Sequence, residues 1–321
     1  MLAFNKPFIE VVKSGIIAPK FIYKLDRKVF CNMIKKFKSS LRIAFLSGLA
    51  LLMVSCKAVV LDPKGVIASD ERTLIFTAVG LMLIVVIPVF IMTFMFAWKY
   101  RASNSQATYD PHWTHSTLLE VVVWSVSGII VAILATITWI SSHRLDPYKP
   151  LDVITKPVNI QVIALDWKWL FIYPEENIAT INYIKLPVNV PINFKITSDA
   201  PMNSFWIPQL GGQIYAMTGM QTQLHLMATN VGQYGGGSAN FSGAGFSGMR
   251  FVASVGSQED FEQWVSEVRQ SANTLNDGEY IQIEKPSENT PVTYYSSVRP
   301  GLYHDVILKF MMPNANLPSR F

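Results

Sequence analysis

One loop near the C-terminal side has the pattern of a metal-binding loop. It reads GQYGGGSANFSGAGFSGMRF, from Gly232 to Phe251, and alternates small residues with spaced polar and aromatic ones before Met249. A metal at such spacing would need thiolate or imidazole ligands. The loop contains neither cysteine nor histidine. It therefore has the pattern of a metal site without the side chains that hold a metal.

His225 is a second candidate ligand. It could bind Cu(I) together with three nearby methionines: Met217, Met220 and Met227. Strand spacing would put His225 and Met227 on the same face. Such a coincidence is common, so a packed or partner-facing strand is the favoured interpretation.

Three other polar residues have ordinary explanations beside the functional ones. His112 and His115, in DPHWTHS, lie in a polar turn with no cysteine or carboxylate cluster in the neighbouring sequence, which disfavours a metal pair. Glu120 opens an apolar stretch, where a carboxylate can handle protons. At the edge of a bilayer, a hydrated carboxylate or one paired with a neighbouring subunit is favoured.

Two uncharged stretches predict membrane helices. Thr73–Trp98 has 26 residues and Val121–Ile140 has 20, and neither contains a charged residue. Each is long enough to span a bilayer as a helix, which satisfies its own backbone hydrogen bonds. The short polar link between them favours a helical hairpin.

The N-terminal region has the features of an export signal. Basic residues up to Arg42 precede the apolar run Ile43–Val54, which is too short to span a bilayer but fits a signal-peptide core. The run leads into LLMVSC, which resembles a lipoprotein box with Cys56 as the acylated residue. The alternative is an ordinary signal peptide with an incidental cysteine. Met33 is a plausible translation start, which would leave Cys31 without a role.

The N-terminal region accounts for the positive net charge of the chain, and as an export signal it would also set the orientation of the membrane hairpin. The chain carries a net charge of +5, but from Cys56 onward 17 Lys and Arg stand against 20 Asp and Glu. No nucleic-acid surface is therefore expected.

The positive-inside count does not decide the orientation of the hairpin. A cleaved export signal would leave Cys56 outside, so residues after Ser141 are expected on the periplasmic side of a bacterial inner membrane.

The region after Val158 predicts a β-sandwich. Short β-branched and aromatic runs are separated by Pro, Gly and Asn, which is typical of sandwiches and barrels. Ser257 and Asp260 then resemble a capping box at the start of an amphipathic helix. The tail after Asn273 is rich in aromatic residues and is expected to pack on the domain or on a partner.

This arrangement resembles subunit II of haem–copper respiratory oxidases, and its local sequence is most similar to the quinol-oxidising bo-type branch. The resemblance covers nearly all of residues 56–260. It rests on six stretches: LDPKG (61–65), GLMLIVVIPVF (80–90), FAWKYRASN (96–104), DWKWLFIYPE (166–175), MNSFWIPQLGGQIYAMTGMQTQLHLMA (202–228) and FSGAGFSGM (241–249). It implies a cupredoxin-like sandwich after the membrane hairpin.

The resemblance also explains the loop without ligands. Relatives that oxidise cytochrome c hold a dinuclear copper centre with two cysteines, two histidines, a glutamate and a methionine. The matching positions here are degenerate: Asn203 and Phe246 for the histidines, Ser238 and Ser242 for the cysteines, Asn240 for the glutamate, and Met249, which is retained. Neither a serine hydroxyl nor a phenyl ring replaces a soft thiolate or an imidazole. The same relatives keep an aromatic patch for electron entry where this chain has Trp167 and Trp169, which are expected here to pack.

The function implied is that of a non-catalytic subunit II of a proton-pumping ubiquinol oxidase, without a metal, cofactor or catalytic residue in this chain. Ubiquinol reaches a haem in the large subunit through the bilayer, so a copper port becomes unnecessary. Haem and copper are expected in the partner, subunit I. The alternative is a free-standing, membrane-anchored cupredoxin that binds copper or a redox partner.

Four regions are predicted. They are a leader over 1–55, a two-helix membrane domain over 56–150, a cupredoxin-like periplasmic domain over 151–272, and an aromatic-rich extension over 273–321.

Overall fold

The computed structural model describes residues 58–108, 112 and 114–311. Cys56, Met33 and the predicted leader lie outside the described residues. From Val59 onward, the described residues belong to one compact unit.

Two long helices follow a short 3-10 turn, η1 (Val59–Leu61). Helix α3 spans Val66–Lys99 and helix α4 spans Thr117–Arg144, and both are long and apolar enough to cross a membrane. The predicted hairpin is thus confirmed, and each helix extends beyond the uncharged stretch inside it. α3 begins seven residues before Thr73 because the charged residues there oppose membrane burial but not helix formation.

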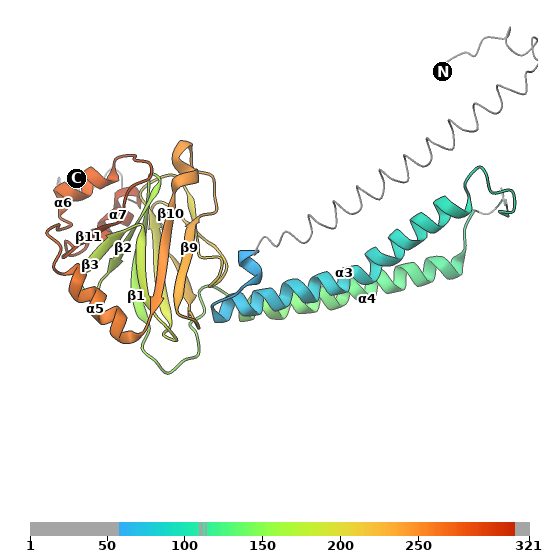
Figure 1. The fold of residues 1–321 in the computed structure, drawn as a ribbon, viewed down its shortest axis with the longest axis horizontal. Helices are drawn as coiled ribbons and strands as arrows, with labels where there is room; N and C mark the ends of the chain where they lie inside the picture. Colours follow the sequence, from blue (N-terminus) through green and yellow to red (C-terminus); the bar gives the residue numbers. More distant parts are fainter. Residues whose placement is uncertain (1–57, 109–111, 113, 312–321) are drawn as a thin grey trace, which may run out of the picture. The chain divides into compact units, whose positions relative to one another are not determined.

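The strands form two sheets packed face to face (Figure 1). The six-stranded sheet has the order β11-β3-β2-β1-β5-β8 and the five-stranded sheet the order β4-β10-β9-β6-β7. The bounds are β1 Val158–Leu165, β2 Lys168–Tyr173, β3 Ile178–Ile181, β4 Tyr183–Pro187, β5 Ile192–Ser198, β6 Asn203–Trp206, β7 Ile214–Ala216, β8 Thr222–Leu226, β9 Gly232–Ser238, β10 Arg250–Gly256 and β11 Thr293–Tyr295. The predicted sandwich is confirmed.

The larger sheet is buried on both faces, which explains why its central strands contain few polar residues. Along β1, Ile160 and Val162 face the space between the sheets, whereas Ile163 and Leu165 face a second apolar cluster. Since successive strand residues point to opposite faces, an almost continuous apolar strand needs a cover on each side.

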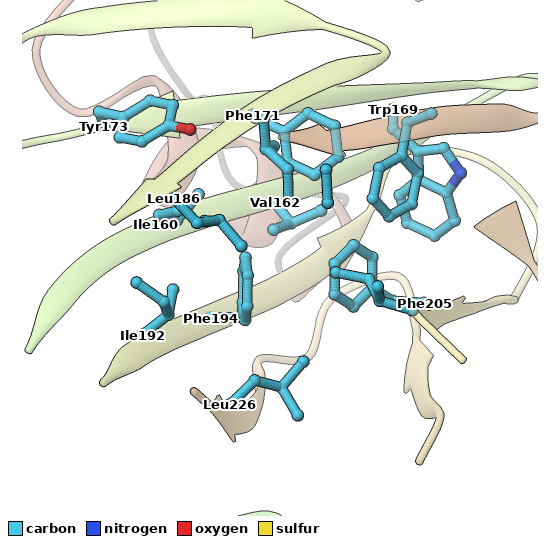
Figure 2. Packing of buried hydrophobic residues seen from close by; sticks show 14 of the residues in the cluster. Ile160, Val162, Trp169, Phe171, Tyr173, Leu186, Ile192, Phe194, Phe205 and Leu226 are labelled. Atoms are coloured by element: carbon cyan, nitrogen blue, oxygen red, sulfur yellow. The ribbon is translucent and has the colours of Figure 1, made fainter. Parts of the chain in front are cut away.

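Aromatic side chains fill the space between the sheets (Figure 2). Phe205 from β6 stacks on Phe251 from β10 with ring centroids 5.2 Å apart. Trp169 from β2 packs edge-on against both rings. Together these rings join the two sheets.

The second cluster lies beneath the C-terminal extension. Helices α5 (Gln258–Val268), α6 (Asp277–Glu284) and α7 (Leu302–Met311) follow the last long strand, and β11 adds to the sheet beside β3. The predicted capping box of Ser257 and Asp260 is present at the start of α5. Tyr280, Tyr295 and Val306 pack on the outer face of the six-stranded sheet. The aromatic tail therefore packs on the domain itself.

Candidate functional site

The degenerate copper positions come from three segments that the smaller sheet brings together. Asn203 begins β6 and Ser238 ends β9, and these two strands pair directly. Met249 immediately precedes β10, which pairs with β9 on its other side. Between Ser238 and Met249, the chain forms a loop containing the 3-10 turn η2 (Ala244–Gly248). Neighbouring strands thus place residues that are distant in the sequence side by side.

The polar side chains of this cluster form hydrogen bonds with one another and with nearby backbone carbonyl groups. Ser238 Oγ lies 3.0 Å from Asn203 Oδ1 and 3.0 Å from the carbonyl oxygen of Asn240, so its single proton has two acceptors within reach. The side-chain amide of Asn203 donates to the Pro201 carbonyl at 2.7 Å. The amide of Asn240 donates to the Met202 carbonyl at 2.9 Å. Asn203 is only 1% exposed, and its polar groups are engaged by neighbours.

The other three positions, Ser242, Phe246 and Met249, are held mainly by packing rather than by side-chain hydrogen bonds. Met249 is fully buried, and Phe246 packs edge-on against Phe241 with centroids 5.5 Å apart. Ser242 accepts a hydrogen bond through its backbone carbonyl, whereas its buried hydroxyl has no hydrogen-bond partner in the described part of the chain. The structure places Ser238, Phe246 and Met249 around one hollow of about 480 Å³.

This donor set does not fit a copper centre. Its polar members are hydroxyl and amide groups, which are hard donors, and a single buried thioether is the soft one. The Ser238 hydroxyl is already bonded to protein neighbours. Within the described residues, no group of three or more His, Cys, Asp or Glu side chains is placed to hold a metal ion. The side chains of this loop therefore supply no redox centre.

Trp167, in the turn between β1 and β2, contacts this loop. Its indole Nε1 donates to the carbonyl of Ser242 at 3.0 Å. A Cβ at Gly245 would come within 2.4 Å of the indole, so only glycine permits this approach. Trp167 also has a positive φ of 62°, an unusual conformation for a bulky residue. The expected packing role of Trp167 agrees with these contacts, and that of Trp169 agrees with its ring contacts to Phe205 and Phe251.

The histidine candidates have separate surroundings. His225 is 9% exposed, and its Nδ1 lies 3.0 Å from the carbonyl oxygen of Pro147. This contact supports the interpretation of His225 as part of a packed strand. His115 Nδ1 lies 3.2 Å from the hydroxyl of Thr114. His112 and Glu120 are exposed in this chain.

Sequence reasoning missed the joint between α3 and the β domain. The backbone amide of Lys64 donates to Gln209 and that of Val66 to Met227, while Gly65 forms a β-bridge with Ala228. A Cβ at Gly65 would meet backbone atoms of Leu210 and Met227 at 2.7 to 2.9 Å. The start of α3 is therefore built into the domain. The LDPKG motif contained this glycine, but its spacing did not show what it contacts.

A second feature missed from the sequence fastens the C-terminal extension. Asp199, whose side chain is fully buried, accepts hydrogen bonds from Tyr280 at 2.6 Å and from Lys309 at 2.9 Å. Burial raises the pKa of the Asp199 carboxyl, although both hydrogen bonds oppose the shift. Lys309 also pairs with Glu284 at 2.5 Å. Asp199 thus joins α6 and α7 to the segment just before the degenerate site.

Lys168 makes a third connection to the extension. It is 1% exposed, and its Nζ donates to the carbonyl of Lys285 at 2.7 Å and to the hydroxyl of Ser287 at 2.5 Å. Burial lowers the pKa of its ammonium group. The ammonium therefore tethers the segment after α6 to the start of β2.

Two families match the exported part of this chain. Residues 174–255 match "Cytochrome C oxidase subunit II, periplasmic domain" and residues 269–314 match "COX Aromatic Rich Motif". The first range contains the whole of the degenerate loop, and the second contains the extension that Asp199 and Lys168 fasten.

Similar proteins extend the match to the membrane part. The "Cytochrome bo(3) ubiquinol oxidase subunit 2" of Pseudomonas putida is 55% identical over 269 residues, covering 84% of this chain and 86% of that protein. The "Ubiquinol oxidase subunit 2" of Acetobacter aceti is 51% identical over 279 residues, covering 86% and 91%. Among solved structures, the periplasmic domain of cytochrome oxidase subunit II of Bradyrhizobium japonicum matches at 20% identity and a TM-score of 0.34, covering 36% of this chain and 96% of that one.

Proposed function

This chain belongs to the family of bo-type cytochrome ubiquinol oxidase subunit 2, and on that premise we propose that it serves as the non-catalytic subunit II of a proton-pumping terminal ubiquinol oxidase. The complex oxidises ubiquinol and reduces O2 to water. The chain itself supports assembly of the complex and covers the haem-bearing subunit I on the outer side of the membrane.

The observation that carries this assignment is the closed cluster at Ser238. A soluble electron donor would need a port in the exported domain, and here Asn203 and Ser238 are bonded to each other while Met249 is buried. Ubiquinol arrives within the bilayer and can deliver electrons to subunit I without such a port. The role of the degenerate loop is therefore to maintain the shape of the exported domain.

The joint at Gly65 supports the structural role. A domain that covers a partner subunit must keep a constant position relative to its membrane helices. The backbone hydrogen bonds of Lys64, Val66 and Ala68 to the domain limit their relative movement. The helix surfaces exposed in this chain offer apolar area for close packing against subunit I.

Localisation and processing form part of the same proposal. The export signal is removed, Cys56 becomes an acylated N-terminus, and the β domain lies on the periplasmic side of the bacterial inner membrane. Haem and copper belong to subunit I, and the remaining partners are the other oxidase subunits and membrane lipid.

The alternative, a free-standing anchored cupredoxin, is disfavoured by two observations. The degenerate positions lack a donor set for copper. The similarity to quinol oxidase subunits also covers most of the chain, with the helices included.

The assignment is tested by activity normalised to haem. A strain that lacks this chain is complemented with the wild type or with Ser238→Ala, and ubiquinol-dependent oxygen uptake is measured per haem. We expect nearly unchanged turnover for Ser238→Ala, with Ser247→Ala, an exposed serine of the same loop, as the matched control. If Ser238→Ala abolished turnover at normal haem and subunit content, the domain would be carrying electrons and the assignment would fail.

A further inference from the structure

A small cavity lies at the joint and has no part in the function described above. Its volume is about 240 Å³, and its walls come from the first turns of α3, the segment after α4, and strand β8. This is below the roughly 300–1,000 Å³ of pockets that enclose drug-sized molecules. The cavity therefore suits a small group, such as the polar head of a larger molecule.

The distribution of charged residues along the two helices indicates that the cavity lies where both helices leave the hydrocarbon. The apolar run of α4 ends near Trp139, which is 70% exposed, and Arg144 on the cavity wall is the last residue of α4. Asp70 and Glu71 line the cavity just before the uncharged stretch of α3 begins at Thr73. Tryptophan and the first charged residues mark the level of lipid headgroups.

The cavity wall carries both positively and negatively charged side chains. Arg144 donates to Asp70 at 2.5 Å, which uses one of its five N–H donors. Lys149 adds a second cation, and it is exposed. Glu71, Asp146 and Asp152 supply further carboxylates, so the wall has more acidic than basic groups. Glu71 lies against Gly212, where a Cβ would meet its Oε1 at 2.8 Å. A ligand that complements this wall has an anionic group and a cationic group.

His225 adds a buried polar group to the same wall. Its Nδ1 lies 3.0 Å from Pro147 O, and this is its one side-chain hydrogen bond within the described residues. The other ring nitrogen, Nε2, is left for a ligand. A wall of two cations, four carboxylates and an imidazole offers hydrogen-bond donors for an anionic group and acceptors for an ammonium group.

We propose that this cavity binds the headgroup of a phospholipid with a primary amine, a phosphoethanolamine head, from the outer leaflet. The phosphate lies toward Arg144 and Lys149, and the ammonium group donates to Glu71 and Asp146. A trimethylated choline head has no N–H to donate and fits the acidic side poorly. The bound lipid fills the joint between the hairpin and the exported domain.

The test is lipid retention by the whole purified oxidase. The complex is delipidated in detergent, given equal amounts of phosphatidylethanolamine, phosphatidylcholine and phosphatidylglycerol, and analysed by native mass spectrometry. We expect one phosphatidylethanolamine per complex with at least about tenfold preference over phosphatidylcholine, the ratio that about 1.4 kcal/mol gives. Glu71→Gln should abolish this preference, and Lys149→Gln should weaken retention of both lipids.

Two further variants keep the result interpretable. Asp146→Asn changes an exposed carboxylate of the wall and should reduce the preference if Glu71→Gln prevents assembly. Glu175→Gln changes a surface carboxylate of the exported domain, paired with Lys156, and should leave retention unchanged. Equal retention of the two lipids, or a preference unchanged in both Glu71→Gln and Asp146→Asn, would overturn the proposal. If soluble phosphoethanolamine occupies the complex as fully as the lipid does, the cavity is a solute site and the lipid assignment is wrong.

Discussion

Ser238 Oγ lies 3.0 Å from Asn203 Oδ1, so two of the positions that the sequence resemblance matches to copper ligands are bonded to each other. This hydrogen bond joins the start of β6 to the end of β9. A neutral hydrogen bond of this kind contributes about 0.5–1.5 kcal/mol. That is enough to help hold the loop, and it supplies no redox chemistry.

The first prediction concerns copper. The full chain, purified alone in detergent and treated with a chelator, should retain far less than one copper per chain and show no thiolate–copper absorbance. The reason is that Ser238, Asn203 and Phe246 offer no soft donor. Metal analysis and optical spectra provide the measurement. Met249→Leu, which removes the remaining soft donor of the set, should not change copper content, and chelator-resistant stoichiometric copper would contradict the prediction.

The second prediction concerns the joint. Gly65→Ala should destabilise the chain by about 1–3 kcal/mol, as overpacking does, because the new methyl group meets backbone atoms that cannot rotate away. The denaturant midpoint, followed by tryptophan fluorescence, measures the loss. Gly80→Ala is the matched control within α3, since nothing lies within 4 Å of its Cβ. Equal midpoints for the two variants would show that the close approach at Gly65 is unimportant.

The third prediction concerns the extension. Lys309→Met should cost about 3–5 kcal/mol, because it leaves the buried Asp199 carboxylate without its cation. Thermal unfolding of the purified chain measures this loss. Lys156→Met removes a lysine from the exposed pair with Glu175, where solvent screens the charges, and should lower the unfolding temperature far less than Lys309→Met does.

The same variant should respond to pH in a defined direction. Since burial raises the pKa of Asp199 above its ordinary value, ionisation of Asp199 opposes folding. This penalty is full at pH values above the raised pKa of Asp199 in the folded chain. It disappears as the pH falls below the ordinary pKa that Asp199 has in the unfolded chain. The deficit of Lys309→Met relative to wild type should therefore shrink as the pH is lowered from about 7.5 to about 5. A deficit that grows on acidification would contradict the role given to Asp199.

The fourth prediction concerns membrane insertion. Val85→Arg, in the middle of α3, should cost about 2.5–3.5 kcal/mol of insertion free energy. We expect less assembled oxidase, with ubiquinol oxidation falling in proportion to haem content. Val85→Leu is the control and should assemble normally. A drop in turnover per haem in the residual Val85→Arg complex would indicate a role beyond assembly.

The fifth prediction concerns processing. Mass spectrometry of the N-terminal peptide should find a mature chain that begins at an acylated Cys56. Cys56→Ser should leave most oxidase activity, because two membrane helices already anchor the chain and one lipid group adds little. An unmodified Cys56, or a mature chain that still contains Ile43–Val54, would show that the region is not a lipoprotein signal.

Residue type and local periodicity were sufficient for several features. The uncharged stretches at 73–98 and 121–140 predicted both long helices, because membrane burial requires an apolar run of that length. Short β-branched runs predicted the sandwich, and Ser257 with Asp260 predicted the start of α5. The unsuitability of the loop for copper also followed from side-chain chemistry, since no arrangement turns a serine or phenylalanine into a soft ligand.

Contacts between distant parts of the chain were decided by the tertiary structure. Nothing near Gly65 in the sequence indicates that Leu210 and Met227 will exclude a side chain there, and nothing near Asp199 identifies Lys309 as its partner. Nor could spacing show that Ser238 would bond to Asn203, which requires the pairing of β6 with β9. Local pattern reports which face of an element is buried, whereas the packing of whole elements determines what each face meets.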